Sequence, residues 1–204
     1  MYVQWLQEKI KQNNWGKREF MFWKDNGYDY AWLWQQLDFF TKKIETNQIE
    51  SGRVCAIFGD YSPYSVALLL ALIRNKNIIV PVSTAIEERR NYYGDTSQVE
   101  FIFEFNECGD FSIQKTGNSV SNQLLIVLQQ LRSSGLVLYT SGSTGNPKAD
   151  LYDFHILINQ FRGFSKRAYI MEFCLLLALS ALIFPHAICG NAKINHGLSR
   201  WKRF

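Results

Sequence analysis

A stretch of hydroxyl side chains, glycines and one lysine at residues 139–148 could bind phosphate groups. Gly142 and Gly145 let the main chain approach a ligand closely. Successive backbone N–H groups in such a turn bind anions, and Lys148 adds a mobile positive charge. The neutral donors are the hydroxyls of Thr140, Ser141, Ser143 and Thr144. These groups together are suited to binding a polyphosphate and to neutralising its leaving group.

This segment has two other interpretations. The loop of P-loop NTPases ends in Gly-Lys-Ser/Thr, whereas here Asn146 and Pro147 precede Lys148 and no hydroxyl residue follows it. A generic turn is the second alternative, because turns favour serine and glycine. The apolar run at 135–139 leads directly into the polar stretch, and this makes phosphate binding the more specific interpretation.

The residues before this segment predict an α/β fold, with a mainly parallel sheet and flanking helices. Short apolar runs at 53–58 and 77–82 indicate buried strands, and a helix with Pro63 in its first turn separates them. Strand, helix and strand in this order form a βαβ unit. Other strands are expected at 19–23, 98–105, 110–115 and 135–139. Other helices are expected at 3–11, after Asp29 as N-cap, after Ser83 or Thr84 to about Tyr93, and at 124–132.

The composition excludes several classes of protein. Of the 204 residues, 47% are hydrophobic and 20% are charged, which is typical of a globular chain and not of a disordered one. The net charge of +4 is too small to indicate nucleic acid as a partner. The N-terminus lacks the apolar core of a signal peptide, so a cytoplasmic location is expected. The cysteines show no metal-ligand spacing and are expected to be reduced spectators; they are Cys55, Cys108, Cys174 and Cys189.

The string Y-T-S-G-S-T-G-N-P-K at 139–148 resembles the phosphate-binding signature of the AMP-forming synthetase superfamily. This superfamily includes acyl-CoA and aryl-CoA synthetases and the adenylation domains of peptide synthetases. The βαβ block and the segment that begins at Tyr30 resemble it more weakly. The resemblance covers about residues 20–165 and is strongest at 136–149. It implies the fold of the first lobe of the large domain of these ligases.

The resemblance also implies a reaction. A carboxylate attacks the α-phosphate of ATP and forms an acyl-adenylate and pyrophosphate, and the acyl group then passes to a thiol such as coenzyme A. By resemblance, the phosphates of ATP with Mg²⁺ would be held by Thr140, Ser141, Gly142, Ser143, Thr144 and Gly145, and Lys148 would be catalytic. No protein ligand for the metal is assigned. The expected partners are ATP and a small-molecule carboxylate.

Two residues after the lysine depart from the family pattern. Tyr152 stands near a position where members often carry a histidine, and Asp150 is an unusual acid so close to a phosphate site. Later family signatures do not occur after Lys148: the Y-G-x-T-E segment, the T-G-D aspartate and the lysine of the small C-terminal domain. The alternative functions are therefore a catalytically inactive remnant that at most binds nucleotide phosphates, or a membrane-associated interaction protein.

We expect two regions, a partial adenylation domain at 1–170 and an apolar, then basic, tail at 171–204. Residues 173–192 carry no formal charge, but Pro185 and Gly190 interrupt this run, which favours a buried segment over a membrane span. A changed reading frame after about residue 171 is a further hypothesis for the tail. A truncated sheet would expose an apolar edge or face, so self-association is expected.

Overall fold

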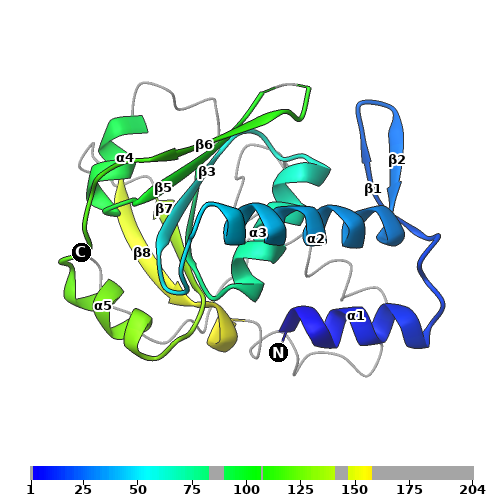
Figure 1. The fold of residues 1–204 in the computed structure, drawn as a ribbon, viewed down its shortest axis with the longest axis horizontal. Helices are drawn as coiled ribbons and strands as arrows, with labels where there is room; N and C mark the ends of the chain where they lie inside the picture. Colours follow the sequence, from blue (N-terminus) through cyan, green and yellow to red (C-terminus); the bar gives the residue numbers. More distant parts are fainter. Residues whose placement is uncertain (1, 83–89, 107, 141–146, 158–204) are drawn as a thin grey trace.

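The computed structural model describes residues 2–82, 90–106, 108–140 and 147–157 (Figure 1). The helices in these ranges are α1 Tyr2–Gln12, α2 Tyr30–Thr46, α3 Pro63–Arg74, α4 Arg90–Thr96 and α5 Gln123–Gln130. The strands are β1 Glu19–Trp23, β2 Asn26–Asp29, β3 Val54–Phe58, β4 Ile78–Val82, β5 Phe101–Phe105, β6 Phe111–Lys115, β7 Gly135–Thr140 and β8 Lys148–Asp153. The proposed tail at 171–204 and its apolar run at 173–192 lie outside the described residues.

The main sheet has the strand order β6-β5-β3-β4-β7-β8. The four inner strands are parallel to one another, and an antiparallel strand pairs with them at each edge. The predicted α/β class and mainly parallel sheet are confirmed. The strand predicted at 98–105 begins later, at Phe101, because Gln98 takes a positive φ of 52° and turns the chain before the strand.

Helices cover both faces of this sheet (Figure 1). The buried side chains of α1, α2 and α3 pack on one face, and those of α4 and α5 pack on the other. Helix α3 is buried along almost its whole length, which explains its uniformly apolar sequence. Ser62 caps it, with Ser62 Oγ accepting from the Ser65 backbone N–H at 3.2 Å. The βαβ unit predicted from the apolar runs is therefore the centre of the fold.

Helix α2 begins after Asp29, as predicted. Oδ1 of Asp29 accepts a hydrogen bond from the Trp32 backbone N–H at 2.7 Å. The buried positions of α2 recur at helical spacing and face α3; they are Tyr30, Leu33, Leu37, Phe40 and Ile44.

Strand β2 was not predicted. It pairs with β1 as a separate two-stranded hairpin, and its residues Asn-Gly-Tyr-Asp show no apolar alternation. The hairpin forms because Lys24 and Asp25 both take positive φ values, 48° and 62°, which matches the two-residue turn that favours strand pairing.

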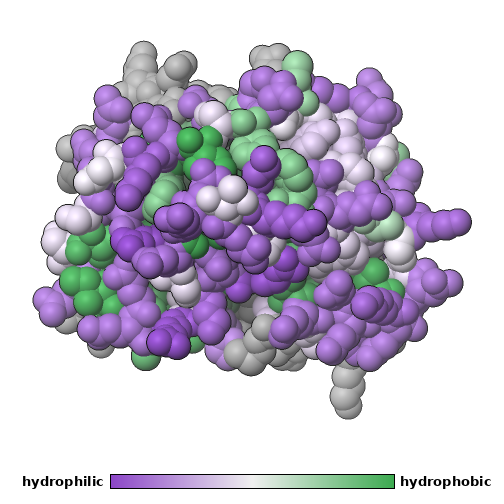
Figure 2. All heavy atoms as spheres, in the orientation of Figure 1, coloured by the Kyte–Doolittle hydropathy of each residue, from purple (hydrophilic) through white to green (hydrophobic). Residues whose placement is uncertain are grey.

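The face in Figure 2 is mostly hydrophilic, with small apolar patches. One of them lies over α5. Val127 on this helix and Leu131, its C-cap, are both exposed. Self-association stays a prediction. No helix within the described ranges is long and apolar enough to cross a membrane.

Candidate functional site

Strands β7 and β8 bring the two ends of the polar stretch together. Thr140, the last residue of β7, pairs with Lys148, the first residue of β8. The predicted residues between them lie outside the described residues: Ser141, Gly142, Ser143, Thr144 and Gly145. The described part of the candidate site therefore consists of the two strand ends and the elements that contact them.

The strand ends lie at the carboxyl edge of the parallel sheet. Strand β4 is the neighbour of β7, and β3 is the neighbour of β4, all running in the same direction. The turn after β3 is joined to the end of β4, since the Gly59 backbone N–H donates to the Val82 carbonyl at 3.1 Å. Open α/β sheets bind their ligands at this edge. The location of Thr140 and Lys148 thus agrees with a ligand-binding role.

Side chains on β8 alternate between its two faces. Ala149 and Leu151 are buried, while Lys148 is exposed at the strand end. Asp150 is half-buried on the same face as Lys148. Tyr152, the next residue on that face, packs against the core formed with α1, α2 and α3. Packing against this core explains the tyrosine at position 152, where family members often carry a histidine. Asp150 places a carboxylate two residues from the exposed lysine.

Helix α4 contacts both strand ends, which sequence reasoning did not predict. The Tyr139 hydroxyl donates to the Tyr93 carbonyl at 3.0 Å and lies 2.5 Å from Oγ of Ser97. The Tyr92 hydroxyl donates to the Pro147 carbonyl at 3.0 Å. Burial raises the pKa of Tyr139 to about 12, and this outweighs the opposite effect of its hydrogen bond with Ser97. The Tyr139 phenol thus keeps its proton at physiological pH.

Comparison with solved structures gives the same architecture. The N-terminal subdomain of NpsA from Klebsiella oxytoca, in complex with 3-hydroxyanthranilyl-AMSN, has a TM-score of 0.52 and 22% identity, covering 71% of this chain and 38% of that one. An artificial fusion of NpsA with ThdA, an adenylation-carrier di-domain, has a TM-score of 0.54 and 21% identity, covering 73% and 32%. These likenesses show the fold. No family model matches the chain.

Two curated proteins are similar in sequence. The chain is 25% identical to one of the subunits of mycosubtilin synthase from Bacillus subtilis over 193 residues, which cover 85% of this chain and 7% of that protein. It is 29% identical to the D-alanine–D-alanyl carrier protein ligase of Staphylococcus epidermidis over 136 residues, covering 63% and 28%. The chain is related to adenylate-forming ligases. The predicted resemblance to AMP-forming ligases is thereby confirmed, and the chain spans less than a third of either curated relative.

The far end of the β7–β8 pair is held by Asp153. Its Oδ1 accepts from Oγ of Ser133 at 2.9 Å and from the His155 backbone N–H at 2.7 Å. The Phe154 backbone N–H also donates to the Ser134 carbonyl at 2.9 Å. Asp153 therefore caps the helical turn after β8 and joins it to the chain before β7.

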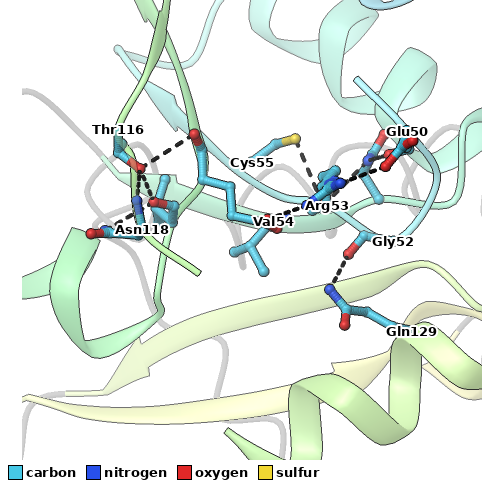
Figure 3. Close-up of polar contacts among 11 residues, drawn as sticks. Glu50, Gly52, Arg53, Val54, Cys55, Thr116, Asn118 and Gln129 are labelled. Carbon is cyan, nitrogen blue, oxygen red and sulfur yellow. Dashed lines mark hydrogen bonds and ion pairs between the residues drawn. The ribbon is translucent and has the colours of Figure 1, made fainter. Parts of the chain in front are cut away.

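A second polar network lies at the opposite end of the sheet, before β3 and β5. Arg53 lies beside Glu50 there, and Nε2 of Gln129 on α5 donates to the Gly52 carbonyl at 2.9 Å (Figure 3). Oγ1 of Thr116 donates to the Val99 carbonyl at 2.6 Å. This network joins the amino ends of the strands, at the edge of the sheet opposite the candidate site.

The part of the chain that the structure describes contains no protein cluster suited to a metal ion. Groups of three or more His, Cys, Asp or Glu side chains with suitable geometry are absent from these ranges. Adenylate-forming ligases in general use ATP with Mg²⁺. Mg²⁺ at nucleotide sites is usually held by one or two carboxylates together with the substrate phosphates, so the described residues alone assign no metal ligand.

Proposed function

We propose that this chain binds the triphosphate of ATP at 140–148 and serves in the activation of a carboxylic acid as its adenylate. The observation that carries the proposal is the pairing of Thr140 with Lys148 at the carboxyl edge of the sheet, with the lysine exposed. The Tyr139–Lys148 sequence, which resembles the family signature, and the relationship to adenylate-forming ligases support it.

The proposed reaction has two steps. A carboxylate oxygen attacks the α-phosphorus of ATP, the bond from that phosphorus to the bridging oxygen breaks, and pyrophosphate leaves. A thiolate sulfur then attacks the acyl carbonyl carbon, and AMP leaves with the electron pair of the acyl–oxygen bond. The ammonium of Lys148 neutralises charge that develops on the leaving pyrophosphate, and this lowers the barrier of the first step.

The names of the relatives narrow the choice of acid and acceptor. The Staphylococcus epidermidis protein is named as a ligase for D-alanine and a D-alanyl carrier protein. We therefore propose an amino acid as the first class of substrate to test, with a carrier-protein thiol or coenzyme A as the acceptor.

The test is exchange of labelled pyrophosphate into ATP, measured with D-alanine, the L-amino acids and aryl carboxylic acids in turn. Exchange that depends on one acid is the expected result, and Lys148→Ala should lower it at least about tenfold, as expected for a lost charged hydrogen bond. Lys42→Ala is the matched control, because Lys42 is exposed on α2. ATP binding without exchange for any acid would contradict adenylate formation by this chain, and absence of ATP binding would contradict the whole proposal.

A further inference from the structure

Helix α4 contacts the chain on both sides of the phosphate-binding segment. We propose that Tyr92, Tyr93 and Ser97, called here the α4 clamp, position the two ends of this segment for ATP; this inference rests on the proposed function. The three residues would act through Tyr139 and Pro147, and are therefore positioning residues.

The first half of the clamp holds the end of β7. A phenol hydroxyl has one hydrogen, which Tyr139 donates to the Tyr93 carbonyl, so the hydroxyl of Ser97 donates to Tyr139 in turn. The Tyr93 and Tyr139 rings also lie in contact, with centroids 4.2 Å apart. Tyr139 directly precedes Thr140, and these contacts therefore fix the backbone one residue before the segment leaves the sheet.

The second half holds the start of β8. Pro147 has no N–H, so its carbonyl is its only backbone hydrogen-bonding group, and the residue is buried. Thr140 and Lys148 form the last pair between β7 and β8, so Pro147 lies just beyond the described pairing. The Tyr92 hydroxyl donates to its carbonyl. This hydrogen bond restrains Pro147, the residue directly before Lys148.

Together the two halves restrain both ends of the segment from one short helix and the residue that follows it. A ligand then meets strand ends that already have their bound orientation, and less entropy is lost on binding. The hydrogen bond of Tyr92 can be tested separately. Tyr92→Phe removes the hydroxyl but keeps the ring, and Tyr92 is 37% exposed, so the substitution disturbs little packing. A purely structural role predicts a change in stability alone, whereas positioning predicts a change in ligand affinity.

The test compares Tyr92→Phe and Tyr139→Phe with the wild type for binding of Mg·ATP and of inorganic pyrophosphate by calorimetry. We expect Tyr92→Phe to weaken both about three- to tenfold, the equivalent of one hydrogen bond, with a smaller fall in the unfolding temperature than in Tyr139→Phe. Tyr139→Phe should weaken binding at least as much and lower the unfolding temperature. Tyr64→Phe on α3 is the control and should leave both affinities unchanged. Equal affinity of the wild type and Tyr92→Phe would overturn the clamp while leaving the proposed function intact.

A ligand-free measurement separates the two proposals. Amide hydrogen exchange of the peptide that contains Lys148 should be faster in Tyr92→Phe than in the wild type, whether or not ATP binds. If the wild type binds neither ATP nor pyrophosphate, the proposed function fails, and the clamp is then judged by this exchange rate. Faster exchange supports restraint of the strand end, and an unchanged rate overturns it.

Discussion

Arg53 and Glu100 are joined across the sheet, with Nη1 of Arg53 donating to Oε1 of Glu100 at 2.7 Å. The second oxygen of the carboxylate accepts from the Val54 backbone N–H at 3.0 Å. Glu100 is buried, with 6% of its side chain exposed, so its bond to the Val54 N–H is shielded from water and its bond to Arg53 is partly shielded. Glu50 binds the same guanidinium from a side chain that is 71% exposed. Two carboxylates thus share one arginine in very different surroundings.

This difference in burial gives a matched pair of variants. Glu100→Ala leaves the Val54 N–H without its acceptor and should lower the free energy of unfolding by about 2–3 kcal/mol. Glu50→Ala removes only an exposed ion pair and should cost less than about 1 kcal/mol. Urea denaturation of the two variants and the wild type measures both values. Equal losses would show that burial does not set the strength of this network.

The N-cap of α2 gives a second prediction. Asp29→Ala removes the acceptor for the Trp32 N–H and should lower the free energy of unfolding by about 1 kcal/mol, whereas Asp29→Asn keeps an acceptor and should cost much less. Thermal denaturation followed by circular dichroism would compare them. If asparagine were as destabilising as alanine, the carboxylate charge, and not the capping hydrogen bond, would be what stabilises the start of α2.

The third prediction concerns pH. Burial raises the pKa of the Cys55 thiol above its ordinary value, and nearby Glu100 adds to this effect. The unfolded thiol ionises near pH 8.5, so above that pH the unfolded state loses a proton that the folded state keeps. Stability therefore falls as pH rises, with a slope that approaches about 1.4 kcal/mol per pH unit once the unfolded thiol is fully ionised.

Replacing the buried thiol should remove that contribution. The wild type should lose more stability between about pH 8.5 and pH 9.5 than Cys55→Ala does, as measured by urea unfolding at both values. Cys108→Ala is the control, because Cys108 is exposed and its variant should keep the wild-type slope. An identical slope in Cys55→Ala would show that the thiol ionises in the folded state.

The sequence was sufficient to predict those elements whose structure depends on one local pattern. Strands β3 and β4 and the capped helix α3 were predictable from their sequences. They are apolar at almost every position, as expected for elements that are buried on all sides. Strand β2 was not predictable from hydrophobicity, since it depends on the conformation of Lys24 and Asp25 and on contacts such as that of Tyr28 with Trp32, whose ring centroids are 4.7 Å apart.

The candidate site was predictable only in part. The residue types at 140–148 indicate phosphate binding by themselves, and the pairing of the strand ends agrees with it. The contacts of α4 were not predictable, because Ser97 and Tyr139 are 42 residues apart and meet only through the packing of α4 on the sheet. Glu100 was likewise expected only as part of a strand, since its partner Arg53 lies 47 residues earlier.

Binding of Mg·ATP to the purified chain, with competition by pyrophosphate and by adenosine, tests the phosphate-binding role most directly. We predict saturable binding that pyrophosphate competes away, that adenosine leaves largely intact, and that Lys148→Ala weakens at least about tenfold while Lys42→Ala does not. Absence of saturable binding, or binding that adenosine displaces and Lys148→Ala leaves unchanged, would contradict a triphosphate site between β7 and β8.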